Sequence, residues 1–569
     1  MAPSTVNVAE YLFTRLYQLG VRDLHGLPGD FNLLACDYVG SSGLTWIGNC
    51  NELNAGYAAD AYGRLRGLGA IMTTFGVGEL SCINAIAGSF SEYVPVVHIV
   101  GVPKTVVQKK NAMLHHTLGN GDFDVFARIA KELSIAQANL MDPVTAPDEI
   151  DRVLRACYIH SRPVYIQLPA DIVQKPVDAK LLDSPIDIET PKSDDEKEGV
   201  VADRILKKLY AAKKPILLVD AGAGRHCVEE LVDSFARKTL LPTFIAPMGK
   251  GMVNEDLPNF VGMYNGALTP IDAWRDMVES SDLIMTIGNV KSDLNTAGFS
   301  YNFNKLNTID LHFDNVSMDY AIYEEIYMRW LLERLVREFD SSKMRKEQTD
   351  LPVISRPPVA ENANFSKEEI THEYLWPRLS SWLKTGDVVV ADTGTSYVGI
   401  WETKLPPGVH VMTQILWSSI GYGVPACQGA AQAIKAEGSG RRTICFEGDG
   451  SFQLTVQELS TIIHHNLDAI IFVIENDGYE IERWVHGEKA SYNDIPKWQY
   501  SLFPNAFTPT EKTSERRVKA YKIRTREELE VLLTDKEFSS GKGLHFVEMH
   551  MPRHNAPTSL INFTETLKK

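Results

Sequence analysis

The fold class is decided by two short stretches, TICFEGDGS at residues 443–451 and AIIFVIENDGY at residues 469–479. Each stretch begins with a run of apolar, β-prone residues, Thr443–Phe446 and Ala469–Ile474, and each ends in a polar turn that contains glycine. A helical pattern at Phe452–His465 lies between the two runs. Because parallel strands joined by helices meet at one sheet edge with their carboxyl ends, we expect the two turns to lie close together.

The two turns carry residues that suit a hard cation and a phosphate group. Asp449 offers a carboxylate and Asn476 offers an amide oxygen. Glycines in both turns allow the backbone to approach a ligand closely, and the helix start after Asp449 presents free N–H groups to an anion. Either turn alone is an ordinary loop. Together, after consecutive strands, they predict a Mg²⁺ ion that bridges a diphosphate.

The same alternation of strand and helix patterns runs through the whole chain. We expect further strands at Gly69–Thr74, Val96–Val100, Val164–Leu168, Ile216–Asp220, Leu283–Ile287 and Val388–Ala391. Two polar, proline-containing stretches, 183–199 and 341–367, break the pattern and are expected to be exposed linkers. The sequence therefore predicts an α/β protein with three doubly wound parallel-sheet domains, at residues 1–182, 200–340 and 368–569.

Composition narrows the class of partner. The 569 residues carry a formal net charge of -16 and no long run of Lys or Arg, which argues against a nucleic-acid or anionic-membrane surface. We expect small molecules and other copies of the chain as partners. The seven cysteines form no Cys-x-x-Cys pair and are expected to be reduced core residues. Neither a signal peptide nor a bilayer-spanning run is evident, which favours a cytoplasmic location.

The two turns resemble the signature of thiamine-diphosphate enzymes, a GDG followed about 25–30 residues later by an Asn-Asn turn. Glu475 stands here at the first of the two asparagine positions, a departure, whereas Asn476 keeps the ligand position. The resemblance implies that Mg²⁺ is held by Asp449, Asn476 and the backbone carbonyl of Gly478. It also implies a pyrimidine-binding first domain, a central domain and a diphosphate-binding third domain. The implied cofactor-binding residues are Glu52, Thr395, Ser418, Ile420, Gly448, Asp449, Gly450, Ser451, Asn476, Gly478 and Tyr479.

Glu52 is the candidate for activating the cofactor. It follows the expected strand Thr45–Gly48 and precedes a run of small residues that resembles the pyrimidine-binding domain of the family. A glutamate in an apolar pocket has a raised pKa and can share a proton with a ring nitrogen. The alternative is a first-turn glutamate that only complements a helix dipole. The resemblance also implies that Ile420 wedges the cofactor into a bent shape.

Adjacent histidines, His115 and His116, lie in a polar glycine-rich loop and are suited to proton transfer. This loop resembles that of pyruvate decarboxylases, and also that of indolepyruvate decarboxylases, almost residue for residue. The segments around Asp30 and Glu482 resemble the same branch of the family. We therefore expect Asp30, His115, His116 and Glu482 to handle protons and the substrate carboxylate, with the individual assignments open.

The resemblance to fungal-type pyruvate decarboxylases covers almost the whole chain. It implies non-oxidative decarboxylation of pyruvate to acetaldehyde and CO₂ through a C2 carbanion and an enamine on the cofactor. The residues Ile481, Val485 and Tyr397 are implied to shape a small substrate pocket. Two alternatives stay open: an indolepyruvate or phenylpyruvate decarboxylase, and an additional structural role as a self-assembling filament. The family organisation implies a dimer of dimers with active sites at the dimer interface.

Overall fold

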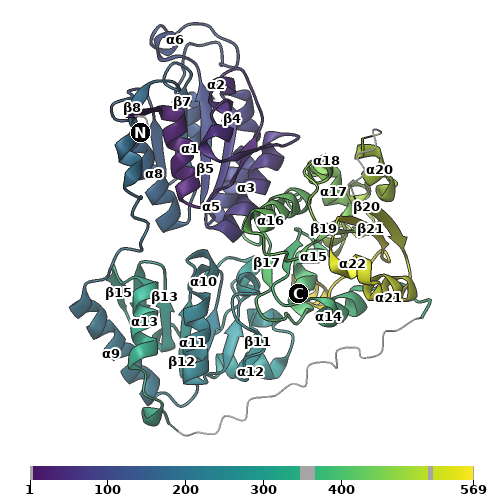
Figure 1. Ribbon diagram of the computed structural model, residues 1–569. Helices are drawn as coiled ribbons and strands as arrows, with labels where there is room; N and C mark the ends of the chain where they lie inside the picture. The colour runs from purple at the N-terminus through teal and green to yellow at the C-terminus, as the bar shows by residue number, and fades with distance from the viewer. Residues whose placement is uncertain (1–3, 346–365, 510–516, 568–569) are drawn as a thin grey trace.

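Three large sheets organise the chain, and each sheet lies between its own helices (Figure 1). The computed structural model describes residues 4–345, 366–509 and 517–567. Each sheet has an apolar cluster on both faces, because neighbouring side chains of a strand point to opposite sides. In the third sheet, Ile471 and Val473 belong to one cluster, whereas Ile470, Phe472 and Ile474 belong to the other. The predicted doubly wound α/β class is confirmed.

The first sheet is entirely parallel, with strand order β3-β2-β4-β5-β7-β6. Its strands are β2 (Asp23–Gly26), β3 (Thr45–Gly48), β4 (Gly69–Thr74), β5 (Val96–Val102), β6 (Ala136–Asn139) and β7 (Val164–Pro169). Its helices are α1 (Val8–Gln18), α2 (Leu33–Cys36), α3 (Glu52–Arg66), α4 (Val77–Ser81), α5 (Ile83–Ser91), α6 (Thr105–Lys109), α7 (Val125–Lys131) and α8 (Ala146–His160). A small antiparallel pair, β1 (Thr5–Asn7) and β8 (Pro176–Asp178), lies beside it.

The central sheet is mixed, which corrects the expectation of three purely parallel sheets. Its order is β11-β10-β9-β12-β13-β14-β15, and its last two strands run antiparallel. A turn of a few residues joins β13 to β14, too short for the crossover that a parallel connection needs. Its strands are β9 (Pro215–Val219), β10 (Thr243–Ile245), β11 (Phe260–Met263), β12 (Leu283–Ile287), β13 (Thr308–Leu311), β14 (Asn315–Met318) and β15 (Ala321–Glu324). Its helices are α9 (Asp195–Ala211), α10 (Gly222–Arg225), α11 (Glu229–Thr239), α12 (Asp272–Glu279) and α13 (Met328–Glu338).

The third sheet is parallel throughout, with order β17-β16-β18-β19-β21-β20. Its strands are β16 (Val388–Ala391), β17 (His410–Met412), β18 (Thr443–Gly448), β19 (Ala469–Glu475), β20 (Val518–Ile523) and β21 (Leu544–His550). Its helices are α14 (His372–Trp382), α15 (Thr395–Gly399), α16 (Gly423–Glu437), α17 (Asp449–Thr455), α18 (Glu458–His464), α19 (Glu480–Val485), α20 (Phe503–Phe507), α21 (Arg526–Thr534), α22 (Lys536–Ser540) and α23 (Thr558–Leu567).

Three sequence predictions need local correction. The helix expected at Phe452–His465 starts earlier, at Asp449, and is divided into α17 and α18, because Val456 and Gln457 accept i→i+3 bonds that tighten the turn. The stretch 183–199 is helical from Asp195 onward. Most of the stretch 341–367 lies outside the described residues.

The cysteines and the helix lengths complete the comparison with the sequence. Four cysteines are buried as expected, but Cys50 and Cys227 are exposed, which corrects the prediction that all seven are core residues. Among the helices within the described ranges, none combines the length and the apolar character needed to span a membrane.

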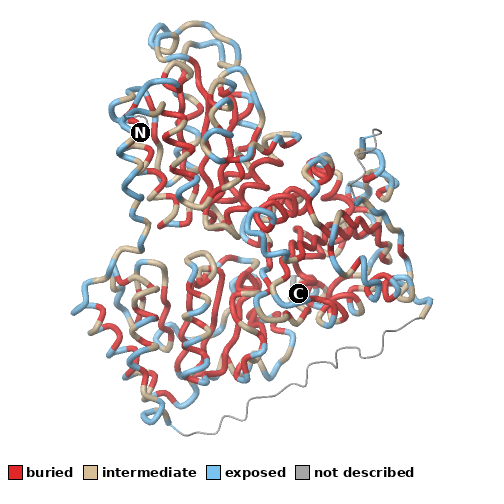
Figure 2. The backbone as a smooth tube through the Cα atoms, in the orientation of Figure 1, coloured by how far each residue is buried: buried red, intermediate tan, exposed pale blue. Residues whose placement is uncertain are grey.

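Helix α3 of the first domain packs directly on α16 of the third domain, and Figure 2 shows a continuous buried zone there. This packing requires a glycine on α16, since a Cβ on Gly429 would lie 2.0 Å from the carbonyl oxygen of Ala58 on α3. Buried polar contacts fasten the two domains: the Tyr422 hydroxyl donates to Asp60, and the Asn49 amide donates to Glu458 at 2.7 Å. The first and third domains of one chain are therefore held in a fixed orientation.

Candidate functional site

The carboxyl ends of β18 and β19 bring Asp449 and Asn476 together, as expected. The Asp449 carboxylate accepts hydrogen bonds from the backbone N–H groups of Gly450 at 2.8 Å and of Asn476 and Gly478 at 3.1 Å each. One side chain thus ties the two turns to each other. The Oδ1 atom of Asn476 is buried and has no hydrogen-bond partner among the described residues. An orphaned amide oxygen beside a buried carboxylate fits a bound hard cation.

We call the site formed by Asp449, Asn476 and Gly478 the cradle. The charges in the cradle also suit a cation. Burial raises the pKa of Asp449 from its ordinary value to about 6, even though backbone N–H groups favour the ionised form. A divalent cation beside the carboxylate would restore the ionised form. The two glycines hold the turns close: a Cβ on Gly450 would lie 2.6 Å from the Tyr479 ring, and Gly478 has a φ of +123°. The donor set fits Mg²⁺ with two protein oxygens and a backbone carbonyl.

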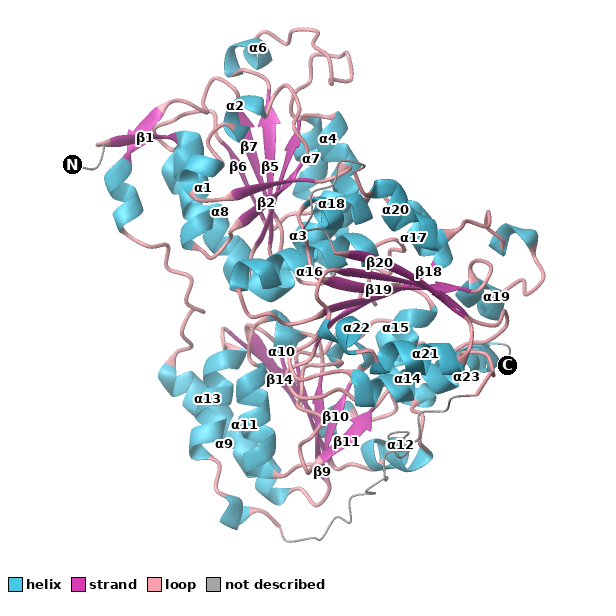
Figure 3. Ribbon diagram, turned by 45° about the vertical axis from the view of Figure 1, so that its right-hand side comes forward, coloured by secondary structure: helices cyan, strands magenta, loops and turns pink. Residues whose placement is uncertain are grey.

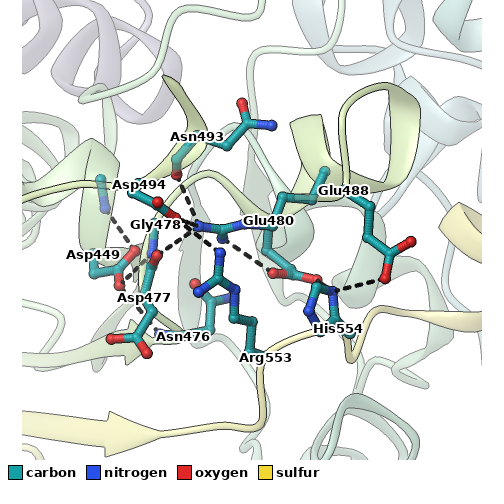
Figure 4. Close-up of polar contacts among 12 residues, drawn as sticks. Asp449, Asn476, Asp477, Gly478, Glu480, Glu488, Asn493, Asp494, Arg553 and His554 are labelled. Carbon is teal, nitrogen blue, oxygen red and sulfur yellow. Dashed lines mark hydrogen bonds and ion pairs between the residues drawn. The ribbon is translucent and has the colours of Figure 1, made fainter. Parts of the chain in front are cut away.

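Arg483, which sequence reasoning missed, lies on α19, the helix that also carries Ile481 and Glu482, and contacts the turn that holds Asn476. Three of its partners, Asp477, Asn493 and Asp494, are drawn near Asp449 and Asn476 in Figure 4. Its guanidinium is fully buried and donates to the carbonyl oxygens of Asp477 at 2.8 Å and Asn493 at 3.0 Å. It also pairs with Asp494 at 2.7 Å and with the buried Glu480 at 3.3 Å. Only the fork of an arginine reaches all of these acceptors at once. The sequence signal was weak, because a single arginine in a polar helix is usually a surface residue.

We expect Arg483→Met to weaken cofactor and Mg²⁺ binding and to destabilise the fold by about 3 kcal/mol, since it leaves buried acceptors unpaired. Arg483→Lys keeps the charge but loses the fork, so an intermediate effect is expected. The measurements are urea unfolding and the Mg²⁺ concentration that gives half-maximal activity. Arg128→Met is the control, because Arg128 forms an exposed ion pair with Asp122 and its loss should leave both readouts unchanged. Equal stability and equal Mg²⁺ dependence of the Arg483 and Arg128 variants would show that Arg483 does not hold the two turns in place.

A second group of predicted residues meets in the first domain. His115 Nε2 contacts Asp30 Oδ2, and His116 Nδ1 lies 3.7 Å from Asp30 Oδ1. The ring of Phe31 stacks on His115 with centroids 5.1 Å apart and meets the edge of His116 at 5.9 Å. Asp30 and Phe31 follow β2, and the histidines lie in the loop between α6 and α7. Loops after parallel strands thus form a joint acid–base cluster at the carboxyl edge of the first sheet.

The backbone behind His116 is supported by Gly76 and Glu79. A Cβ on Gly76 would lie 2.2 Å from the carbonyl oxygen of His116, and both residues have positive φ values, +67° and +64°. The buried carboxyl of Glu79 accepts from the N–H of Gly76 at 2.8 Å and from the hydroxyl of Tyr165 at 2.7 Å. Burial raises the pKa of Glu79 to about 7, against these hydrogen bonds.

This raised pKa predicts a pH-dependent stability that Glu79→Gln removes. The pKa of Glu79 in the folded protein lies above its unfolded value of about 4.5. Glu79 therefore adds most to the free energy of unfolding below pH 4.5, and this stabilisation is lost as the pH rises to about 7. Between these two pH values we expect the wild type to lose about 3 kcal/mol relative to Glu79→Gln. Chemical denaturation of both proteins across this range measures the difference. Parallel stability curves would show that Glu79 titrates normally.

Glu52 is the first residue of α3, directly after the N-cap Asn51, whose side chain accepts from the N–H of Asn54. Burial raises the pKa of Glu52. Its Oε1 lies over Gly78 of α4, where an added Cβ would be only 3.0 Å away. The position fits both a helix-dipole role and a proton-sharing role, and the raised pKa favours the second.

The predicted substrate-pocket residues are divided between an apolar cluster and the surface. Tyr397 is buried and shares a cluster with the partly buried Ile481, whereas Val485 and Glu482 are exposed.

The remaining predicted cofactor-binding residues lie in the third domain. Thr395 is buried at the start of α15. Ser418 takes a left-handed φ of +54° and its hydroxyl donates to the carbonyl of Ile415, and Ile420 follows partly exposed. Gly448 and Ser451 flank Asp449 at the start of α17.

Polar contacts do not link the two groups of predicted residues within the described part of one chain. Among the described residues, no hydrogen bond or ion pair joins Glu52 or the Asp30–His115–His116 cluster to the Asp449–Asn476 cradle or to Glu482. Figure 3 shows α6, near the histidine loop, far from α19. A cavity of about 490 Å³ lies instead where the three domains meet, and none of the predicted site residues lines it. The two groups are therefore not joined by polar contacts within the described part of one chain.

Comparison with known proteins decides the family. Three segments match, in order, the N-terminal TPP binding domain, the central domain and the C-terminal TPP binding domain of thiamine pyrophosphate enzymes, at residues 6–123, 202–328 and 392–549. The chain belongs to this family. The cradle at Asp449 lies in the C-terminal TPP binding domain, and Glu52 and the histidine cluster lie in the N-terminal one. The cofactor of a thiamine pyrophosphate enzyme is thiamine diphosphate.

Full-length relatives narrow the comparison further. The chain is 49% identical to a pyruvate decarboxylase of Aspergillus fumigatus over 98% of this chain and 96% of the relative. It is 50% identical to a pyruvate decarboxylase of Aspergillus terreus with the same coverage. Pyruvate decarboxylase isozyme 1 of Saccharomyces cerevisiae is 42% identical over 98% of each chain. The match therefore includes all three domains of this thiamine pyrophosphate enzyme.

Proposed function

We propose that this protein decarboxylates pyruvate to acetaldehyde and CO₂ without oxidation, with thiamine diphosphate and Mg²⁺ as cofactors. The observation that carries the proposal is the presence, in one chain, of a cation cradle with an orphaned Asn476 oxygen and of an Asp30–His115–His116 cluster. Full-length identity to relatives named pyruvate decarboxylase supports the choice of substrate. Neither an aryl-pyruvate substrate nor a purely structural assembly is favoured by these relatives.

Asp449, Asn476 and the Gly478 carbonyl would hold Mg²⁺, and the backbone around Gly448, Gly450 and Ser451 would receive the diphosphate. When bound, thiamine diphosphate supplies the electron sink that allows a 2-keto acid to lose CO₂. Burial raises the pKa of Glu52, and this carboxyl would share a proton with the pyrimidine ring of the bound cofactor. Thr395, Ser418, Ile420 and Tyr479 are proposed to complete the cofactor pocket.

The remaining residues act on the substrate. Loss of CO₂ leaves a carbon that must gain one proton before acetaldehyde is released, so the overall reaction consumes one H⁺. Asp30, His115, His116 and Glu482 are proposed to supply this proton and to orient the carboxylate. The contact between His115 and Asp30 holds the imidazole in place for that role. Ile481, Tyr397 and Val485 are proposed to limit the pocket to small 2-keto acids.

The lack of polar contacts between the two groups, within the described residues of one chain, supports a site built from two chains. We propose that the first domain of one chain faces the third domain of another, so that Glu52 and Asp449 act on one cofactor from different chains, and that two such dimers associate. The exposed face of Glu482 and the half-exposed Glu52 are then covered by the partner. A cytoplasmic location is part of the same proposal and is open to cell fractionation.

The test is acetaldehyde formation from pyruvate by the purified protein with thiamine diphosphate and Mg²⁺, measured with a coupled alcohol dehydrogenase. Phenylpyruvate is assayed alongside. Turnover of pyruvate supports the proposal. Turnover of phenylpyruvate alone would move the protein to the aryl branch, and turnover of neither would leave a cofactor-binding protein with another role.

A further inference from the structure

Asp30, His115 and His116 form the one group, among the described residues, in which three or more His, Cys, Asp or Glu side chains each bring a ligand atom to a common point. Those atoms all lie within 4.8 Å of one another. Two ligands of one tetrahedral Zn²⁺ lie about 3.3–3.5 Å apart, given metal–ligand bonds of about 2.0–2.1 Å. The 3.7 Å between His116 Nδ1 and Asp30 Oδ1 is close to that spacing. The contact between His115 Nε2 and Asp30 Oδ2 is shorter than that spacing, so an ion would enter by opening this contact. A small side-chain movement would then bring the three ligand atoms around one ion.

The cluster is held in place before any ion arrives. Phe31 stacks on one imidazole and meets the edge of the other, and Gly76 supports the backbone of His116 in its left-handed conformation. His116 Nδ1 is buried and has no hydrogen bond in the described part of the chain. Its contact with Asp30 Oδ1, at 3.7 Å, is longer than a hydrogen bond, so this ring nitrogen can bind an ion. Such preorganisation lowers the entropic cost of binding an ion.

The ligand set selects the kind of ion. Two imidazoles and one carboxylate, with an open position for water, suit Zn²⁺ and neighbouring transition ions, whereas Mg²⁺ prefers oxygen ligands. We propose that Asp30, His115 and His116 bind one divalent transition ion per chain, with Zn²⁺ as the probe, at a site separate from the Mg²⁺ cradle. The ion occupies the same lone pairs that the proposed reaction needs for protons, so it inhibits turnover reversibly. Binding itself does not depend on the proposed function; only the inhibition rests on it.

The test is calorimetric titration of the full-length holoenzyme with ZnCl₂ in a non-chelating buffer that contains excess Mg²⁺ and thiamine diphosphate. We expect one Zn²⁺ per chain, and we expect His115→Gln, His116→Gln and Asp30→Asn each to lower the affinity by at least about tenfold. The matched control is His464→Gln with His465→Gln, a second adjacent histidine pair that belongs to no such group within the described residues. This control should bind Zn²⁺ as the wild type does. Circular dichroism checks that each variant is folded.

Two further readouts separate this site from other metal sites. Asp449→Asn should retain Zn²⁺ binding, because the cradle in the third domain is not involved. Co²⁺ in place of Zn²⁺ should give weak visible d–d bands that are lost in His115→Gln, without the intense thiolate band expected if Cys50 or Cys227 were the ligand.

Absence of Zn²⁺ binding, or binding that survives all three cluster substitutions, would overturn the inference. Loss of binding in Asp449→Asn alone, or a thiolate band with Co²⁺, would do the same. Zn²⁺ binding without any effect on pyruvate turnover would uphold the site and count against the catalytic roles of these residues. A protein that binds Zn²⁺ but turns over no 2-keto acid would likewise separate the metal site from the proposed function.

Discussion

Glu52→Gln is expected to lower kcat/KM for pyruvate by about 10²–10⁴-fold, the usual contribution of a positioned acid–base group. The change is isosteric but removes the titratable carboxyl, whose pKa is raised by burial. The position at the start of α3 leaves the helix and its Asn51 cap intact, so folding should be almost unchanged. Steady-state kinetics at saturating cofactor, together with thermal unfolding, measure the two effects separately.

The control for Glu52 is Glu149→Gln. Glu149 also lies in the first turn of a helix, α8, where it is partly exposed and pairs with Arg152. If Glu52 only complements a helix dipole, the two variants should behave alike and both should remain active. An active Glu52→Gln protein would remove the basis for its assignment as the activating carboxylate.

Asp449→Asn is expected to weaken Mg²⁺ binding by more than about 100-fold, the upper range seen even for residues one shell further from a metal. Activity should fall with it. The asparagine loses the charge that attracts the cation, and its NH₂ group would face backbone N–H groups that now donate to both carboxylate oxygens. Titration of activity with Mg²⁺, and of tryptophan fluorescence with thiamine diphosphate, gives the two affinities.

Asp477→Asn is the matched control for the cradle. Asp477 lies in the neighbouring turn, contacts Lys497, and has a φ of +67° that asparagine adopts easily. Its substitution should leave the Mg²⁺ dependence unchanged. Equal Mg²⁺ dependence of the Asp449 and Asp477 variants would show that the cradle is not the metal site.

Much of the fold could be predicted from local patterns. Runs such as Ala469–Ile474 are apolar at every position, and this is the pattern of strands buried on both faces of a sheet. The hairpin after β13 was missed, because strand order and direction depend on which strands pair, and pairing is a long-range property. The division of one predicted helix into α17 and α18 was also missed, because periodicity does not reveal a local change in hydrogen bonding.

Some residues of the candidate site could likewise be predicted from the sequence, and others could not. Asp449 and Asn476 were found because glycine-containing turns after consecutive strands carry an explicit signal. The residues that hold them, Arg483 above all, were missed, because a buried guanidinium has no pattern of its own. Glu79 and Gly76, which support the histidine loop, were also missed, because their contacts with that loop arise only from packing and leave no pattern in the sequence.

By itself, the sequence determined the α/β class, the order of the turns and loops that carry Asp30, Glu52, His115, Asp449 and Asn476, and the likeness to one enzyme family. These properties are encoded in short segments, where residue type and spacing act directly on the backbone. Only the tertiary structure decided which side chains are buried, which atoms lack partners and which groups face one another. It revealed the orphaned Asn476 oxygen and the buried Arg483 with its several acceptors, because burial and contact arise only when distant segments pack together.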